Sequence, residues 1–194
     1  ELCKIYSGYS WNDKITVIDN RFISERVNQI RNWNMDFVQG DILDKELIKK
    51  HCSDADIIHH LAGITDVPRV KSQSNADHDK KIIEVAQEGT QNILDVMKDD
   101  CKIVMPSTHV VFEGLETVKN DILENEETAP ILSYGKSKDY NEKQLKESGK
   151  NYIILRLGSV YGYSTDTARI DIMANYFSKV ASQNGILKLF AGGR

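Results

Sequence analysis

Short apolar runs alternate along the chain with longer segments of helical periodicity. The runs are dominated by Ile, Val, Leu, Phe and Tyr, which predicts five buried strands at residues 14–18, 35–38, 56–61, 102–105 and 152–157. Helices are predicted at 24–33, 44–51, 80–98, 137–148 and 171–183. This alternation is typical of βαβ units, so the predicted fold class is α/β with a doubly wound parallel sheet.

The helix predicted at 80–98 has apolar residues at positions 82, 86, 93 and 97, which share one face and would cover the sheet. Gly89 interrupts that pattern. A glycine inside a helix costs about 1 kcal/mol relative to alanine, and we interpret it as a point of close packing against the sheet.

The front of the chain shows no glycine-rich phosphate loop. Gly8 stands alone and is interpreted as a helix C-cap or turn. In dinucleotide-binding folds an acidic residue follows the loop by about 20 positions and holds the adenosine ribose. Asp19 ends the strand at 14–18, so the loop is expected upstream of Glu1. A sheet without its first strand would have an edge or a gap at its middle.

The back of the chain carries a predicted strand at 186–190 that no helix follows. The interpretation is therefore a fragment that lacks its first strand and the glycine-rich loop and that continues beyond Arg194. The family resemblance given below implies that residues 1–194 are a single cofactor-binding domain, incomplete at both ends, in which 163–194 begin the substrate-binding portion, and that most of a C-terminal substrate domain is missing.

Composition supports one soluble domain. The chain is 40% hydrophobic and 28% charged with a net charge of -4, which gives no reason to expect nucleic acid or an anionic membrane as a partner. No stretch approaches the roughly 20 apolar residues that span a bilayer. Cys3, Cys52 and Cys101 are widely spaced and odd in number, which argues against disulfides and zinc and favours a reducing cytoplasm.

The candidate chemistry begins with Tyr134 and Lys138, four residues apart and so on one helix face. Alcohol oxidation needs a base, and a tyrosine with a pKa of about 10 is a poor one unless a neighbouring cation favours its phenolate. Ser107 and Thr108 follow the strand at 102–105, at the carboxyl edge of the sheet where ligands bind. Either residue supplies a third convergent group or caps a turn after Pro106.

These motifs together resemble the extended short-chain dehydrogenase/reductases, the family of NAD-dependent sugar-nucleotide epimerases and dehydratases. The matching stretches are, in order, VIDN at 17–20, FVQGDI at 37–42, HLAG at 60–63, GTQN at 89–92, ST at 107–108, YGKSK at 134–138 and LRLGSVYG at 155–162. Their joint order and spacing cover nearly the whole chain and imply a Rossmann-like fold.

The resemblance implies a role for each matching residue. Thr108, Tyr134 and Lys138 would form the catalytic triad, and Lys138 would also hold the nicotinamide ribose. The further cofactor contacts would be Asp19 at the adenosine ribose, Asp41 and Ile42 at the adenine, Leu61, Ala62 and Gly63 along the pyrophosphate, and Ser159 near the nicotinamide. A carboxylate at position 19 favours NAD over NADP, although Arg21 nearby is suited to the extra phosphate.

Some positions depart from the family. Dehydratases of the 4,6 type follow the threonine with Asp-Glu, whereas Thr108 precedes His109 and Val110, so that chemistry is disfavoured. Ala86 replaces the usual asparagine before the Gly-Thr pair.

His59 and His60 are neighbours on a strand, so they point to opposite faces and cannot share a metal; no metal is expected. The polar run at 66–81 is a substrate lid or a surface loop.

The predicted function is an NAD-dependent oxidoreductase or epimerase that acts on a nucleotide-activated sugar. A reductase or a decarboxylating relative would share the first step. The alternative from another class is a non-catalytic NAD(P)-sensing or scaffold protein, which would need no base. The resemblance also implies a homodimer through the helices at 80–98 and 137–148.

Overall fold

The computed structural model describes residues 2–8, 14–65, 75–117, 119–162, 170 and 172–189. It divides into two compact units, of which one runs from Leu2 to Leu157 and the other comprises the segment 158–194. The first unit opens with helix α1 (Leu2–Ser7). The backbone N–H of Gly8 donates to the carbonyl of Ile5 (3.1 Å), so Gly8 forms a turn directly after the helix and its interpretation is confirmed.

All strands of the described residues are parallel to their neighbours. Strands β1 (Thr16–Asp19) and β2 (Asp36–Gln39) pair with Val17 opposite Phe37. Strands β3 (Ile57–His59), β4 (Lys102–Thr108) and β5 (Asn151–Leu157) form a second sheet in the order β3-β4-β5. The five predicted strands are confirmed in position and fall into these two sheets, but their predicted burial is confirmed only for β4 and is wrong for β5, whose residues are exposed or half-buried.

Strand β4 is longer than predicted because its pairing with β5 continues to the match of Thr108 with Leu157. Pro106 does not interrupt it. Ser107 and Thr108 are therefore the last two residues of β4 itself rather than part of a loop beyond it. Strand β3 is shorter than predicted, since residues 60–65 form no regular strand.

Four helices of the first unit follow the strands: α2 (Ser24–Asn32), α3 (Lys45–Cys52), α4 (Ala76–Val96) and α5 (Ser133–Glu147). Helix α4 starts earlier than predicted because the side chain of Asn75 caps it, accepting from the backbone N–H groups of Asp77 and His78. The predicted loop at 66–81 is therefore wrong for 76–81, and its residues 66–74 lie outside the described part of the chain.

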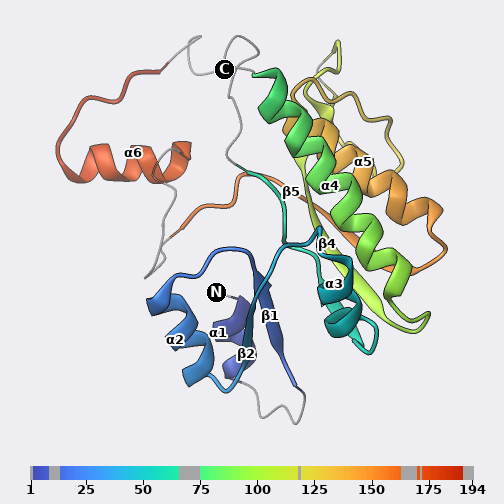
Figure 1. The fold of residues 1–194 in the computed structure, drawn as a ribbon. Coiled ribbons are helices and arrows are strands. Elements are labelled where there is room, and N and C mark those ends of the chain that lie inside the picture. The colour runs from blue at the N-terminus through green and yellow to red at the C-terminus, as the bar shows by residue number, and fades with distance from the viewer. Residues whose placement is uncertain are drawn as a thin grey trace. The chain divides into compact units, whose positions relative to one another are not determined.

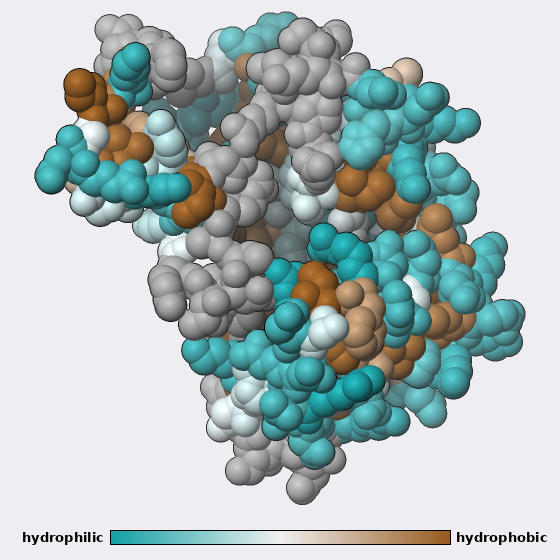
Figure 2. All heavy atoms as spheres, turned by 60° about the vertical axis from the view of Figure 1, so that its left-hand side comes forward, coloured by the Kyte–Doolittle hydropathy of each residue, from teal (hydrophilic) through white to brown (hydrophobic). Residues whose placement is uncertain are grey.

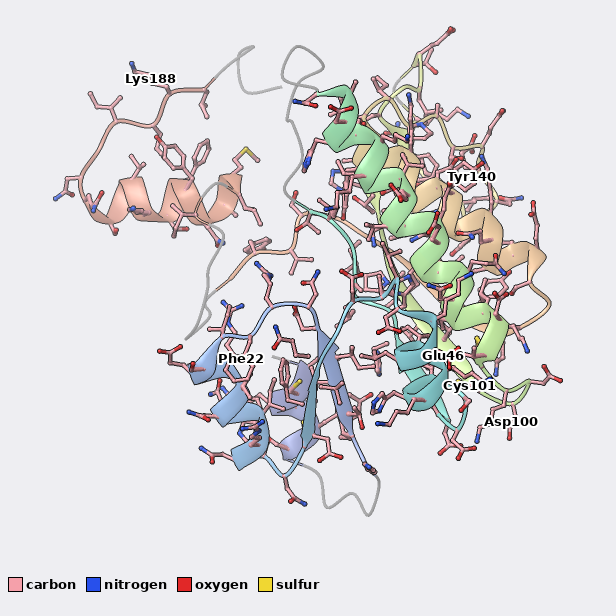
Figure 3. All side chains as sticks on the ribbon, viewed as in Figure 1. Phe22, Glu46, Asp100, Cys101, Tyr140 and Lys188 are labelled. Carbon is pink, nitrogen blue, oxygen red and sulfur yellow. The ribbon has the colours of Figure 1, made fainter. Side chains whose placement is uncertain are left out.

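The core of the first unit lies where α3, α4 and α5 cover the β3-β4-β5 sheet (Figure 1). Gly89 lies within an uninterrupted α4, and a Cβ built there would approach Cγ2 of Ile42 to 2.8 Å. Close packing at this glycine is thus confirmed, but the predicted partner is wrong, since the glycine packs against Ile42 in the turn after β2 and not against the sheet. Cys101, labelled in Figure 3, is fully buried in this core. The buried residues of this core are Ile48, Cys52, Ile93, Leu94, Met97, Cys101, Ile103, Met105 and Leu145.

The segment 158–194 contains helix α6 (Met173–Ser182). The strand predicted at 186–190 is wrong for residues 186–189, which form no regular structure; residue 190 is not described. A strand needs a hydrogen-bonding neighbour, and the described part of this segment contains no strand. Ile186 is accordingly 86% exposed.

Brown apolar side chains stand among teal hydrophilic ones over the surface seen in Figure 2. No helix in the described residues has the length and apolar character of a membrane span.

Candidate active site

A pocket in the first unit is formed by the loop after β3 together with faces of α4 and α5. Tyr134 and Lys138 line it opposite the residues that follow His60. The structure therefore brings the predicted catalytic pair and the predicted pyrophosphate residues into one site. Its lining residues are Leu61, Ala62, Gly63, Ile64, Thr65, Ile82, Ala86, Tyr134, Ser137, Lys138 and Asn141.

The first turn of α5 positions the catalytic pair. The hydroxyl of Ser137 donates to the carbonyl of Tyr134 (2.7 Å), which tightens this turn. Gly135 lets it approach the neighbouring backbone, since a Cβ there would lie 3.1 Å from the carbonyl oxygen of Val110. Tyr134 is half-buried. Lys138 is buried, and desolvation lowers the pKa of its ammonium group.

Ser107 and Thr108 have different partners at the end of β4. The Ser107 hydroxyl donates to Oε1 of Glu142 (2.6 Å) and is buried. The Thr108 oxygen accepts from the N–H of Val110 (3.3 Å), which caps the short 3-10 helix η2 (His109–Phe112). Capping, one of the two interpretations made from the sequence, is thus observed for Thr108. Thr108 does not line the pocket of Tyr134.

A buried ion pair lies between α5 and β5, and sequence reasoning missed it. The guanidinium of Arg156 donates to Glu142 through Nε (3.0 Å) and Nη2 (2.7 Å), and stacks on Phe112 at 5.0 Å. Burial alone would raise the pKa of Glu142, but the hydrogen bonds from Arg156 and Ser107 hold it below its usual value. The sequence does contain two features that point to this pair: Glu142 follows Lys138 by one helical turn, and Arg156 is a charged residue within an apolar strand.

The predicted ribose residue ends β1. The carboxylate of Asp19 accepts the backbone N–H of Arg21 (2.9 Å) and is exposed. It lines a second pocket with Arg21, between β1, β2 and α2. Phe22, labelled in Figure 3, meets Phe37 edge-on near this pocket. A free carboxylate oxygen at the end of a parallel strand is suited to a diol.

The predicted adenine residues lie in the turn after β2. Asp41 accepts from the backbone N–H of Leu43 (3.0 Å) and from the amide of Asn20 (3.3 Å), which links the ends of β1 and β2. Ile42 is held by Asn92 of α4, whose amide donates to its carbonyl (3.0 Å). Asp41 is therefore tied to the residue that follows Asp19, whereas Ile42 is tied to α4.

The side chains of His59 and His60 have different partners, as expected for neighbours on a strand. His59 Nε2 lies 2.7 Å from the Tyr6 hydroxyl, whereas His60 Nε2 lies 2.9 Å from Oγ1 of Thr90. His109 bonds through Nδ1 to the carbonyl of Leu157 (3.3 Å). The described residues contain no cluster suited to a metal, and their three cysteines are free. Ser159 belongs to the segment 158–194, so its predicted place near the nicotinamide stays a prediction.

The parallel sheets, their covering helices and the Tyr-Lys pair beside a strand-end loop define a Rossmann-like α/β protein. Residues 8–193 match the model of the NAD dependent epimerase/dehydratase family, so the chain belongs to that family. It is 30% identical over 157 residues to the probable low-salt glycan biosynthesis reductase Agl14 of Haloferax volcanii. That match covers 78% of this chain and 49% of Agl14, so the chain spans about half the length of this relative.

Solved structures share the fold. The UDP-glucuronic acid 4-epimerase of Bacillus cereus, in complex with UDP-glucuronic acid and NAD, matches with a TM-score of 0.71 at 23% identity, over 97% of this chain and 61% of that one. The UDP-glucose 4-epimerase of Thermotoga maritima, with UDP-glucose, matches with a TM-score of 0.70 at 21% identity, over 98% and 62%. WbmG of Bordetella bronchiseptica, in complex with NAD, matches with a TM-score of 0.70 at 20% identity, over 92% of this chain and 54% of that one.

Proposed function

We propose that the protein is an NAD-dependent epimerase of a nucleotide-activated sugar. The observation that carries the proposal is the shared pocket of Tyr134 and Lys138 with the loop Leu61–Gly63. Family membership supplies the NAD-dependent class, and the epimerases that share the fold have UDP-sugars in their complexes.

The residues of the first unit fit NAD. Asp19 offers a carboxylate to the adenosine ribose, and a Cβ built on Gly63 would meet no atom within 4 Å, so the loop is open where a pyrophosphate would pass. Within the described residues the Lys138 ammonium has no carboxylate in ion-pair distance, which leaves it for ribose hydroxyls. Asp41 and Ile42 would border the adenine. Bound NAD would accept a hydride from the sugar carbon.

Tyr134 is the proposed base. Its phenolate would take the proton of the sugar hydroxyl as the carbon is oxidised. Lowering a tyrosine pKa by about three units requires roughly 4 kcal/mol of preferential stabilisation of the phenolate. Lys138 contributes to it from the same helix face, and because it is buried its charge acts through a low local dielectric. Thr108 would donate its hydroxyl proton to the reacting oxygen.

We propose epimerisation rather than 4,6-dehydration because elimination needs an acid and a base beside the threonine. The residue after Thr108 is His109, whose ring is engaged by the carbonyl of Leu157. No carboxylate pair follows Thr108.

A reductase is the second candidate, favoured by the name of the relative Agl14. The two are separated by incubating the full-length protein with NAD or NADH and a panel of nucleotide sugars, and by analysing both products and nicotinamide absorbance. An epimerase gives an isomeric sugar without net change in NADH, whereas a reductase consumes NADH with a keto-sugar. NAD binding without conversion of any sugar would favour the NAD-sensing alternative.

We also propose a homodimer through α4 and α5 and a cytoplasmic location. Tyr140 of α5, labelled in Figure 3, is 50% exposed and would contribute apolar surface to the dimer contact. Sedimentation of the full-length protein tests the dimer: a concentration-independent monomer would contradict it.

A further inference from the structure

A buried imidazole lies directly before the loop of the pocket. His60 is 3% exposed, and its backbone N–H donates to the carbonyl of Val104 (2.9 Å), so its position at the end of β3 is fixed. Burial and the nearby charge of Lys138 lower the pKa of His60 to about 3. The ring is therefore neutral near pH 7 and carries one proton on one of its two nitrogens.

The identity of that protonated nitrogen follows from Asn141. The amide of Asn141 is 2% exposed, and it is satisfied when its nitrogen donates to the carbonyls of Ser137 (3.2 Å) and Ala86 (3.1 Å). Its oxygen then accepts from Oγ1 of Thr90 (3.2 Å). A hydroxyl has a single proton, so Thr90, having donated to Asn141, accepts from Nε2 of His60 at 2.9 Å.

The three side chains thus form a directed relay, from the His60 Nε2–H to the Thr90 hydroxyl and from there to the Asn141 oxygen. Each member comes from a different element around the pocket, although only Asn141 lines it: His60 precedes the pocket loop, Thr90 lies in α4, and Asn141 lies in α5. Asn141 follows Tyr134 by seven residues and Lys138 by three, which places all three on one helix face. Tyr134, Lys138 and Asn141 all line the pocket.

We propose that Thr90 is a positioning residue, whose hydroxyl fixes the face of α5 that carries Tyr134 and Lys138 relative to the loop Leu61–Gly63. This proposal rests on the proposed function. Thr90 is itself fully buried and outside the pocket lining, so it acts through His60 and Asn141 and touches neither cofactor nor substrate. Catalytic geometry is sensitive to such supports, because a displacement of about 1 Å costs up to roughly a hundredfold in rate.

The test compares two substitutions in the full-length protein. Thr90→Val keeps the volume and removes the hydroxyl, whereas Thr90→Ser keeps the hydroxyl and removes a methyl group. We expect Thr90→Val to lower kcat about tenfold and to weaken NAD binding about fivefold, with KM for the sugar nucleotide unchanged. Thr90→Ser should restore both to near wild-type values, although its thermal midpoint falls. A merely structural role would lower thermal midpoints and leave kcat intact.

Three results overturn the proposal: a wild-type kcat in Thr90→Val, a loss in Thr90→Ser as large as in Thr90→Val, or unchanged NAD affinity in both. If the wild-type protein converts no nucleotide sugar, the proposed function fails separately. NAD affinity then decides the proposal, since fivefold weaker binding in Thr90→Val with recovery in Thr90→Ser supports it and equal affinities refute it.

Discussion

Substituting Glu142 by Gln tests how the end of β4, the face of α5 and the end of β5 are held together. The side chain of Glu142 is 1% exposed and that of Arg156 is 16% exposed. Glutamine keeps the volume but loses the charge, and its NH2 group would oppose one of the donors on Arg156 or Ser107. Removing one partner of a buried pair costs about 3–5 kcal/mol. Arg156 retains the Glu124 carbonyl and some solvent, so we expect about 3 kcal/mol.

The assay is urea denaturation of the full-length protein at pH 7. With an m-value of about 2 kcal/mol/M, a loss of 3 kcal/mol lowers the midpoint by about 1.5 M. Lys146→Ala is the matched control, because Lys146 contacts the same carboxylate at 3.3 Å while being 46% exposed. We expect the control to cost under about 0.5 kcal/mol. A midpoint of Glu142→Gln that equals that of Lys146→Ala would refute the reasoning.

The same cluster predicts a pH dependence. The pKa of Glu142 is lower in the folded state than its ordinary value of 4.5. Its contribution is therefore fully present above the unfolded pKa and is lost as the pH falls through the folded one. The stability difference between the wild type and Glu142→Gln should shrink below pH 4.5. A difference that stays constant on acidification would show that the carboxylate charge is not what Arg156 needs.

Four further predictions concern other positions. Asp19→Asn should weaken NAD binding about tenfold and leave NADP binding unchanged or improved, as measured by titration. Gly89→Ala should cost about 1–3 kcal/mol through its contact with Ile42, whereas Gly63→Ala meets open space and should weaken NAD without loss of stability. Burial lowers the pKa of His60 to about 3 in the folded protein, so the contribution of His60 to stability is full above its unfolded pKa of 6.5 and is lost as the pH falls toward 3. The urea midpoint of the wild type should therefore be lower at pH 5 than at pH 7. In His60→Gln the difference between the two midpoints should be smaller.

Much of the fold could be predicted because parallel strands appear in a sequence as apolar runs, even though Ile57 and Leu155 are 53% and 43% exposed in this structure. All five strands were found in this way, and helices α2 to α6 were found from their apolar periodicity. Helix starts were less accurate, since Asn75 caps α4 from within a polar run and hydrophobic periodicity gives no information about caps. The strand predicted at 186–190 failed because an apolar run cannot reveal whether a neighbouring strand exists to pair with it.

The site was predicted in part. Tyr134 and Lys138 were found by their spacing, which fixes a shared helix face, and the structure places them beside the loop at 61–63. Sequence could not show that Ser107 donates to Glu142 while Thr108 caps the 3-10 helix after β4. It also missed Thr90, because a relay between three elements depends on tertiary packing that local patterns do not record.

The most direct test of the central claim is the effect of Tyr134→Phe on the full-length protein with the sugar nucleotide that the panel identifies. The account predicts that kcat falls by about a thousandfold or more, since general base catalysis is worth 10²–10⁴ and is lost with the hydroxyl, while NAD binds as tightly as before. Turnover within twofold of the wild type would contradict the assignment of Tyr134 as the base.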